Sequence, residues 1–286
     1  MRGFPYGWLV SATSVTWWGH STVWLDDSGV TLLTDPVLTD RVIHLRRTAG
    51  PTPRLPGAPD AVLLSHLHAD HFHLPSLRAV PGEPLLIVPR GAAAFVAEGL
   101  GSAYARRCLE LAPGEETTVR GVKIRAVPAA HPGGRGPWSR QEADALGFVV
   151  EGTSRTWYAG DTGLFDQMSE LAPLDLALVP VGGWGPTLGA HGHLDPDTAA
   201  EAVRRVKADW AVPVHYGTFW PIGLGRVRPH MFHDPGREFA RRAARTMPDT
   251  RVRVLTHGET LTIGPGAIQR DSGVADLDGT AREETA

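Results

Sequence analysis

The sequence predicts an α/β fold in which two β-sheets pack together and helices cover their outer faces. Short apolar segments separated by turn residues occur in two batches along the 286 residues, and each batch is followed by helical segments. Hydrophobic residues make up 42% of the chain and charged residues 21%, as in an ordinary globular protein. A chain of this length and composition can bury a substantial core.

The first batch of strands begins with a hairpin pattern. Segments 14–25 and 30–34 are rich in Val, Thr and Trp, and Asp27-Ser28-Gly29 lies between them. The Ala-rich segment 91–98 predicts a short helix. Between the hairpin and this helix, two short apolar runs predict buried strands, at 61–64 and 84–88.

The second batch repeats this pattern around turn glycines. Gly121 and Gly152 each lie between two strand-like segments, which predicts hairpins with strands at 116–120, 122–127, 146–151 and 155–159. The apolar run 174–181 predicts one more buried strand. Two short segments near the C-terminus complete the expected sheets, 252–255 and 260–263.

Two expected helices begin at an aspartate that is followed by a proline. Asp195 and Asp234 each offer an N-cap acceptor, and the next residue is a proline, which suits the first helical position. The second helix is expected to run to about residue 247. The apolar face of the first helix consists of Ala199, Val203 and Val206.

No linker or change of composition divides the chain, so we expect a single domain over residues 1–264. From residue 265 to residue 286 the sequence is polar, small and acidic. This composition predicts a disordered C-terminal tail.

Composition and charge exclude several classes of protein. The 28 Lys and Arg residues against 31 Asp and Glu give a formal net charge of −3, which argues against nucleic-acid binding through phosphate neutralisation. The single cysteine, Cys108, excludes a disulfide framework and a zinc site built from several thiolates. No apolar run approaches the roughly 18–20 residues of a membrane span, and the N-terminus lacks the apolar core of a signal peptide. We therefore expect a cytoplasmic protein, and the sequence leaves its oligomeric state open.

A cluster of histidines after the apolar run 61–64 is the strongest indication of function in the sequence. His66, His68, Asp70, His71 and His73 occur within eight residues, on a loop at the end of an expected strand. Imidazole nitrogen and carboxylate oxygen are ligands that zinc, manganese and iron accept. His66 and His68 are two residues apart, so an extended loop can direct both to one side, while Asp70 and His71 can turn toward a second position nearby. The cluster therefore predicts a metal site.

The motif His66-x-His68-x-Asp70-His71 resembles the signature of the metallo-β-lactamase fold superfamily. Other motifs of this superfamily occur in the expected order along the chain, with Asp35 before the histidine motif and His131, Asp161 and His215 after it. Asp35, His131 and Asp161 each follow an expected strand. The resemblance covers roughly residues 14 to 260. It implies an αββα sandwich of two mixed β-sheets flanked by helices, with the metals in a cleft along the sheet edge.

Two shorter motifs are similar to one branch of the superfamily, which holds ascorbate-phosphate lactonases and N-acylphosphatidylethanolamine phospholipase D: Trp18-Gly19-His20-Ser21-Thr22 and Leu33-Thr34-Asp35-Pro36. Two more strengthen the likeness to the phospholipase: Gly192-His193-Leu194-Asp195-Pro196 and His215-Tyr216-Gly217-Thr218-Phe219. One departure concerns His73, which stands where the phospholipase has an acid; the sequence leaves the role of His73 open.

The resemblance implies a dinuclear metal-dependent hydrolase with two divalent ions, zinc being favoured and manganese or iron being alternatives. One ion would be held by His66, His68 and His131. The other would be held by Asp70, His71 and His215, with Asp161 as a bridging ligand. Two such ions about 3.5–4 Å apart can share a hydroxide, which would attack a phosphodiester, lactone or ester in a small-molecule or lipid-like substrate.

Three further residues are assigned roles near the metals. Asp35 is expected to accept the free N–H of a ligand histidine and so to fix its tautomer. His20 is expected to form a buried hydrogen bond close by. His193 lies two residues before an expected helix N-cap and can point at bound substrate, where it would stabilise an oxyanion or protonate a leaving group. The catalytic candidates are His193 and Asp70, the latter also being an expected metal ligand.

Aromatic residues near the expected metal loops are candidates for an apolar substrate pocket. They are Trp138, Trp184, Phe219 and Trp220.

Two other functions remain open at this stage. The superfamily also contains mononuclear iron oxidoreductases of the persulfide-dioxygenase type, which share the His-x-His-x-Asp-His motif. A metal-binding protein without catalysis is the other alternative. The complete ligand set, with His215 included, favours two metal ions, and the chain has no Gly-x-Ser-x-Gly motif that would support a serine nucleophile.

Overall fold

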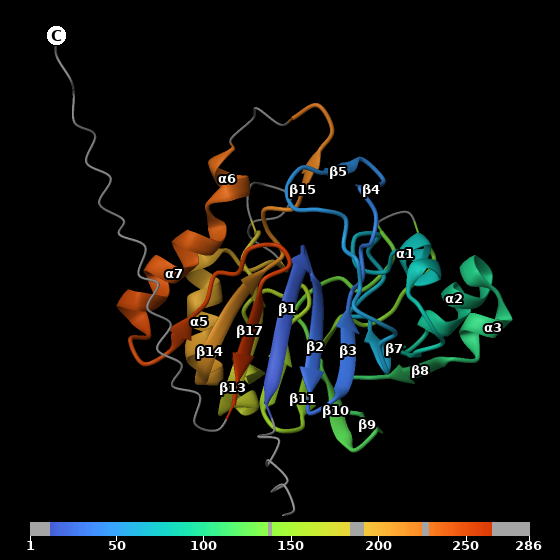
Figure 1. Ribbon diagram of the computed structural model, residues 1–286, viewed down its shortest axis with the longest axis horizontal. Coiled ribbons are helices and arrows are strands. Elements are labelled where there is room, and N and C mark those ends of the chain that lie inside the picture. The colour runs from blue at the N-terminus through green and yellow to red at the C-terminus, as the bar shows by residue number, and fades with distance from the viewer. Residues whose placement is uncertain (1–11, 137–138, 184–191, 225–228, 265–286) are drawn as a thin grey trace, which may run out of the picture.

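The computed structural model describes residues 12–136, 139–183, 192–224 and 229–264. In this part of the chain two seven-stranded sheets pack together, and helices lie on the outer sides (Figure 1). Each sheet contains both parallel and antiparallel pairs, so the predicted αββα sandwich of two mixed β-sheets is confirmed. The expected tail, 265–286, lies outside the described residues, and a single domain over residues 1–264 stays a prediction.

The first sheet is antiparallel at one side and parallel at the other. Its strands are β1 (Thr13–Gly19), β2 (Thr22–Asp27), β3 (Val30–Thr34), β6 (Ala61–Leu63), β7 (Leu85–Pro89), β8 (Cys108–Leu111) and β17 (Thr260–Ile263). They lie in the order β17-β1-β2-β3-β6-β7-β8. The pairs β3–β6, β6–β7 and β7–β8 are parallel, so these strands end at the same edge.

The second sheet has the same division. Its strands are β9 (Glu116–Val119), β10 (Val122–Pro128), β11 (Leu146–Glu151), β12 (Arg155–Tyr158), β13 (Leu174–Pro180), β14 (Ala208–Val214) and β16 (Arg251–Val252). They lie in the order β16-β14-β13-β12-β11-β10-β9, and β12, β13, β14 and β16 run parallel. The apolar faces of the two sheets meet in a core that contains Trp17, Phe148 and Tyr158.

Helices cover the two outer faces. Those on the first sheet are α1 (Leu74–Ala79), α2 (Ala92–Leu100) and α3 (Ser102–Ala105). The second sheet packs against α5 (Pro196–Val206), α7 (Pro235–Thr246) and the short 3₁₀ helix η1 (Asp166–Leu171). One more helix of the described residues, α6 (His230–His233), precedes α7. None of the helices in the described ranges is long and apolar enough to cross a membrane.

A small three-stranded sheet forms a cap at one end of the sandwich (Figure 1). It consists of β4 (Arg41–Val42), β5 (Leu45–Arg47) and β15 (Phe219–Pro221), in the order β15-β5-β4. The buried Arg47 guanidinium lies 4.7 Å from the centre of the Phe219 ring and donates to the carbonyl of Val37. These contacts join two segments that are far apart in the sequence.

The predicted helix at Asp195 is confirmed in detail. The Asp195 carboxylate accepts the backbone N–H of Thr198 at 2.8 Å, and Ala199, Val203 and Val206 are fully buried. The second helix also begins where predicted, but Asp234 makes no side-chain capping bond. The cause is its α-helical backbone conformation, since Asp234 directly continues from α6.

The strand predicted over 14–25 was wrong in its length, because the chain reverses within it. Gly19 and His20 both have positive φ values, 104° and 51°, and they divide the segment into β1 and β2. Similarly, the strand predicted over 252–255 is confined to Arg251–Val252. The prediction also omitted β14, which is the strand that leads to His215.

Candidate metal centre

The metal centre lies at one end of the sandwich, where several strands finish. Each expected ligand is in a loop that follows a strand: the 65–73 loop follows β6, Asp161 follows β12, and His215 follows β14. Because β12, β13 and β14 are parallel, their carboxyl ends open at one edge of the sheet. The sequence places ligands on separate segments, and the topology brings them together.

The first cluster is the histidine triad, His66, His68 and His131. Nδ1 of His68 lies 3.0 Å from Nε2 of His66 and 3.1 Å from Nε2 of His131. Nδ1 of His131 lies 2.6 Å from the carbonyl oxygen of Gly192, so this nitrogen carries the ring proton and Nε2 presents a lone pair. The structure therefore brings together the three histidines that the sequence predicted for one ion.

The second cluster is the Asp70 group, Asp70, His71 and His215. Nε2 of His71 lies 3.2 Å from Nε2 of His215, and Oδ2 of Asp70 lies 3.9 Å and 4.0 Å from these two nitrogens. His20 joins this group, because its Nε2 lies 3.1 Å from Oδ2 of Asp70. Burial and the nearby His215 lower the pKa of His20 to about 4, so the neutral ring donates to the Asp70 carboxylate. The predicted buried hydrogen bond of His20 is thus present.

Asp161 lies between the two clusters. Its Oδ2 is 3.2 Å from Nε2 of His71 and 3.4 Å from Nε2 of His193, and its Oδ1 is 3.2 Å from Nε2 of His215. Asp161 and His131 also have ligand atoms within 4.8 Å of each other. Oδ1 is buried and makes no hydrogen bond. A buried carboxylate oxygen without a hydrogen-bond partner is what a cation site requires.

The electrostatics of the centre favour a cation. Burial alone raises the pKa of Asp161, but the imidazoles of His215 and His71 outweigh burial and hold that pKa well below its usual range. Burial lowers the pKa of His66 well below 6.5 and the pKa of His131 to about 4, so both rings are neutral and keep a free lone pair. Ionised carboxylates and neutral imidazoles are the forms that bind zinc, manganese and iron. The donor set therefore fits divalent metal ions.

Asp35 fixes the 65–73 loop through hydrogen bonds to Ser65 and His71. Its carboxylate is fully buried and accepts the backbone N–H of Ser65 at 2.8 Å, the Ser65 hydroxyl, and the Nδ1–H of His71 at 2.7 Å. The Tyr158 hydroxyl donates to the same carboxylate. Although burial lowers the pKa of His71, the carboxylates of Asp161 and Asp70 outweigh burial and raise it well above 6.5, so Nε2 also carries a proton, which faces Asp161. A metal ion bound between them would take the place of that proton, while Asp35 keeps the other proton on Nδ1. This is the geometry that the expected role of Asp35 requires.

Two residues without an expected role stabilise the loop further. Nη1 of Arg135 donates to the carbonyls of Leu67 and Phe72, at 2.8 Å and 2.9 Å, and so connects both ends of the histidine-rich segment. Nδ1 of His73 lies 2.7 Å from the Ser76 hydroxyl at the start of α1. His73 therefore supports the loop and is not part of either cluster.

A cavity of about 720 Å³ opens onto the centre. Its floor includes Asp70, Asp161 and His193, and its walls are formed largely by the cap and α6. Two of the four aromatic residues predicted for a pocket, Phe219 and Trp220, line this cavity. The other two lie outside the described residues, namely Trp138 and Trp184. The apolar part of the wall includes Val42, Ile43, Leu45, Phe219, Trp220, Met231 and Phe232.

His193 reaches the cavity from the loop before α5, as its position ahead of Asp195 predicts. Its side chain is 13% exposed, and its Nε2 is within 3.4 Å of Asp161. Its ring also lies edge-on to His131, with 4.6 Å between ring centres. The structure therefore places His193 beside both the expected ligands and the substrate cavity.

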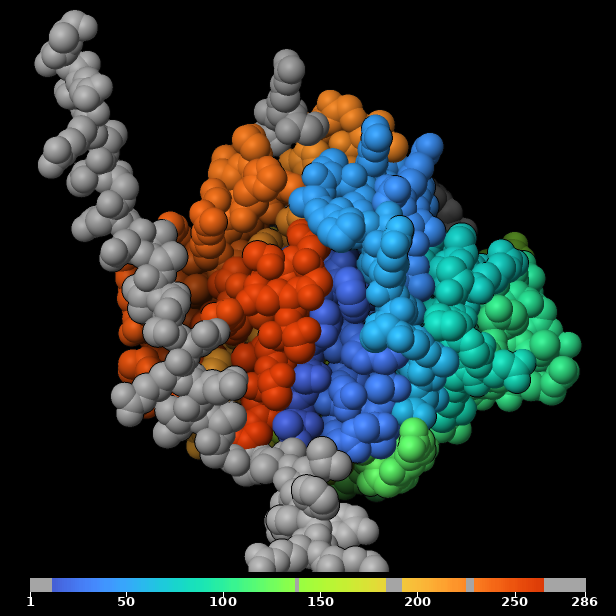
Figure 2. Space-filling view, in the orientation of Figure 1, coloured from blue at the N-terminus to red at the C-terminus, as the bar shows by residue number. Residues whose placement is uncertain are grey.

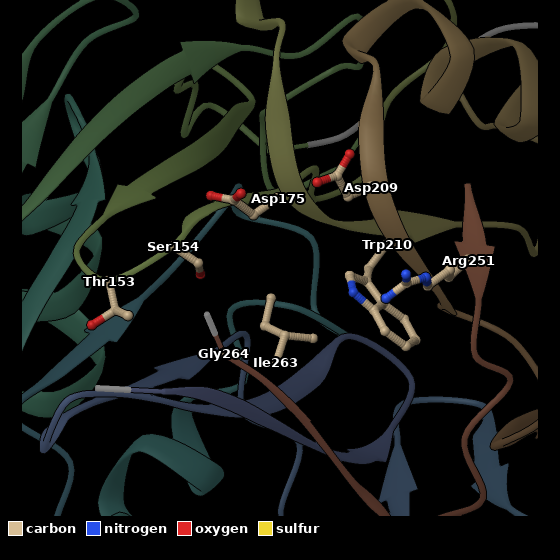
Figure 3. A pocket seen from close by; sticks show the side chains of 8 residues that line it. All are labelled: Thr153, Ser154, Asp175, Asp209, Trp210, Arg251, Ile263 and Gly264. Carbon is tan, nitrogen blue, oxygen red and sulfur yellow. The ribbon is translucent and has the colours of Figure 1, made fainter. Parts of the chain in front are cut away.

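A smaller cavity of about 280 Å³ lies at the opposite end of the sandwich (Figure 3). Its acidic residues, Asp175 and Asp209, are on the amino-terminal ends of β13 and β14, whereas the metal centre is at the carboxyl ends. Trp210 and Arg251 form the other side, with the guanidinium 5.3 Å from the Trp210 ring centre. No histidine lines this cavity among the described residues, so the ligand sets are confined to the large one.

Comparison with known proteins agrees with the fold and the site. The sequence pattern described as the Beta-lactamase superfamily domain matches residues 31–216, and the chain belongs to the metallo-β-lactamase superfamily. It groups there with proteins named metal-dependent hydrolases, and the predicted family is confirmed. One of these is from Thermoplasma acidophilum, 29% identical over 76% of this chain and 88% of its own length.

A second relative is the N-acyl-phosphatidylethanolamine-hydrolyzing phospholipase D 1 of Caenorhabditis elegans. It is 32% identical over 236 residues, which are 74% of this chain, and the chain spans about two thirds (66%) of its length. Among solved structures, the metallo hydrolase Igni18 of Ignicoccus hospitalis has a TM-score of 0.67 at 22% identity. That match covers 88% of this chain and 99% of Igni18, and it supports the fold.

Sequence reasoning missed three residues that shape the centre. Tyr158 is in a largely buried strand whose sequence gives no sign of its bond to Asp35, and Arg135 lies in a loop without a recognisable pattern. His257 was not connected to the site. Its Nε2 lies 3.0 Å from the hydroxyl of Thr218, and this hydroxyl accepts the backbone N–H of His20.

Proposed function

We propose that the protein is a dinuclear metal-dependent hydrolase that cleaves a phosphodiester, lactone or ester bond in a small-molecule or lipid-like substrate. The observation that supports this most directly is the position of Asp161, whose two oxygens reach His71, His193 and His215. The histidine triad would hold one ion and the Asp70 group the other, with Asp161 shared between them. We propose zinc as the metal, since every donor is an imidazole or a carboxylate. Manganese and iron are alternatives, because they accept the same donors.

The metals and the protein have separate tasks. When bound, two divalent ions would supply a Lewis acid and a water whose pKa is lowered toward neutrality. Asp35 keeps the proton of His71 on Nδ1, and His20 orients the Asp70 carboxylate by donating from Nε2. Asp70 and Asp161 remain ionised and so offset the charge of two cations in a buried site.

We assign the proton transfer to His193. Its imidazole lines the cavity, and Nε2 is the nitrogen that faces Asp161. A proton held at Nε2 can be donated to an oxyanion or to a leaving group in the cavity, which contributes about 10²–10⁴-fold to such reactions. Neither role requires a nucleophile from the protein.

The walls of the cavity support a substrate with an apolar portion. Phe219, Trp220 and Phe232 line the same cavity as Asp70, Asp161 and His193. The name of the worm relative is consistent with a lipid-like substrate. We further propose a cytoplasmic location, and we expect no nucleic-acid partner because the net charge is −3.

A panel of substrates on zinc-loaded protein tests this function. Bis(p-nitrophenyl) phosphate, a γ-lactone and a p-nitrophenyl ester represent the three bond types. Hydrolysis of at least one of them, abolished by a chelator and restored by zinc, is the expected result. No hydrolysis of any of the three by protein that carries two metal ions would contradict the proposal, and one iron per chain with oxygen consumption on a persulfide would support the dioxygenase class instead.

The variant His193→Ala tests the assignment of the proton. Metal content and melting temperature should stay near the wild-type values, while turnover falls about 10²–10⁴-fold. Lost metal would identify His193 as a ligand. Turnover within about threefold of wild type, with both metals retained, would remove His193 from the mechanism.

A further inference from the structure

The tip of the β4–β5 hairpin has an isoleucine at a backbone position that disfavours it. Val42 pairs with Leu45, so Ile43 and His44 form a two-residue turn, and Ile43 has a φ of 49°. Turns of this kind place a positive φ at such positions and favour Gly, Asn or Asp. A β-branched residue in the left-handed region is a true outlier, because its Cβ substituents clash with the backbone.

The other turns that the structure describes have no β-branched residue with a positive φ. The hairpin turns at Ser28 and Arg120 also have positive φ, 55° and 46°, but each of these residues is polar and is followed by a glycine. Among the described non-glycine residues with positive φ, Ile43 is the one β-branched side chain. Packing does not account for it, since Ile43 is 68% exposed. Strained residues of this kind concentrate at binding sites, where the surrounding structure maintains them.

Ile43 lies at the mouth of the large cavity and lines it. The other exposed large hydrophobic residues in the described ranges are Ile222 and Leu224, 51% and 47% exposed, and they follow β15 in the same cap. The N–H of Ile222 donates to the carbonyl of His44 at 2.9 Å, which fixes the two segments side by side. Figure 2 shows the blue β4–β5 segment against the orange β15 segment at the top of the molecule.

The cavity also offers a place for an anionic group. Arg135 is the one arginine or lysine among the described residues that line it, and its guanidinium is half-buried. Residues of both ligand clusters, Arg135 and Ile43 therefore line one and the same cavity.

We propose that Ile43 is a specificity-determining residue, which contacts the alkyl chain of an amphiphilic substrate whose polar end lies at the ligand clusters. Ile222 and Leu224 lie in the same cap and add to its exposed apolar surface. The proposal rests on the proposed hydrolase function for the place where the polar end binds. A glycine or asparagine at this position would relieve the backbone strain but would leave the alkyl chain without a contact.

The test compares the binding of decanoate and butyrate to zinc-loaded protein by isothermal titration calorimetry. Decanoate has six more methylene groups, and we expect the wild-type protein to bind it about 100-fold more tightly. Ile43→Asn should weaken decanoate binding at least about fivefold and change butyrate binding less than about twofold. The melting temperature of Ile43→Asn should equal or exceed that of the wild type, because asparagine tolerates positive φ. A purely structural role of Ile43 would lower the melting temperature instead.

Two further variants make the comparison specific. Ile43→Leu restores an apolar side chain and should retain most of the preference for decanoate. Ser28→Asn introduces the same residue at another positive-φ turn, remote from the cavity, and should leave both affinities unchanged.

The proposal is overturned if Ile43→Asn binds decanoate as tightly as the wild type does, or if the wild type shows no preference for decanoate over butyrate. It is also overturned if Ile43→Asn changes the oligomeric state by sedimentation and leaves decanoate binding intact, because Ile43 would then contact a second copy of the chain. Failure of the hydrolase function is a separate result, since these affinities do not depend on turnover.

Discussion

Replacing Asp35 with asparagine tests whether a buried carboxylate behind the ligands determines metal affinity. Oδ1 of Asp35 accepts the N–H of Ser65, while Oδ2 accepts His71, Tyr158 and the Ser65 hydroxyl. If the side-chain oxygen of the asparagine takes the place of Oδ2, the NH₂ group of the asparagine takes the place of Oδ1 and faces the N–H of Ser65, which is also a donor. The hydrogen bond from Ser65 to a charged acceptor, worth about 1.5–3 kcal/mol, is then lost. The other three bonds lose their charge assistance and roughly half their strength. The free energy of unfolding should therefore fall by about 3–5 kcal/mol.

The second effect of Asp35→Asn concerns the metals. His71 loses the carboxylate that fixes its proton on Nδ1, and loss of such a partner lowers metal affinity about 10–100-fold. Zinc affinity is measured by competition with a fluorescent chelator, and stability by urea unfolding. Asp27→Asn is the matched control, because Asp27 is equally buried and accepts the N–H of Thr153 at 2.7 Å at the opposite end of the sandwich. Asp27→Asn should lose stability and keep its zinc affinity; wild-type zinc affinity in Asp35→Asn would refute the reasoning.

Three further predictions follow from the same contacts. Asp161→Ala should lower metal occupancy at both positions in elemental analysis, because its oxygens reach His71 and His215; two tightly held ions and full activity would contradict a bridging role. Arg135→Met should weaken zinc binding and lower the melting temperature, because the carbonyls of Leu67 and Phe72 lose their donor; an unchanged zinc affinity would limit Arg135 to stability. Burial raises the pKa of Cys108 to about 11, so at pH 8 its thiolate fraction is on the order of 10⁻³, and it should react with a disulfide reagent roughly 200-fold more slowly than free cysteine. The rate should rise about tenfold per pH unit between pH 8 and pH 10, and fast labelling at pH 8 would contradict this.

Elements with a strong local pattern could be predicted from the sequence. The apolar runs that form β6 and β13 are buried on both faces, and the Asp195-Pro196 start of α5 has the expected capping bond. The cap could not be predicted, because strands of two or three residues have no period, and β15 pairs with a β5 strand that is far away in the sequence. The reversal at Gly19 is absent from the pattern for a similar reason, since it depends on backbone angles and not on polarity.

The residues of the site likewise fall into those that could be predicted from the sequence and those that could not. The family motif identified the residues that the structure brings together in the histidine triad and the Asp70 group. The residues behind them were not identified, because the bonds of Tyr158 to Asp35 and of Arg135 to the 65–73 loop depend on tertiary packing alone. Tyr158 also looks like an ordinary core residue, since it is 1% exposed at the end of a largely buried strand.

The central claim is that the two clusters hold two metal ions through a shared Asp161. The most direct test is the molar ratio of metal to protein, measured by inductively coupled plasma mass spectrometry after purified protein is loaded with zinc and dialysed. Two donor groups that share one carboxylate predict a ratio of two zinc ions per chain. A ratio of one, or no retained metal, would contradict the account.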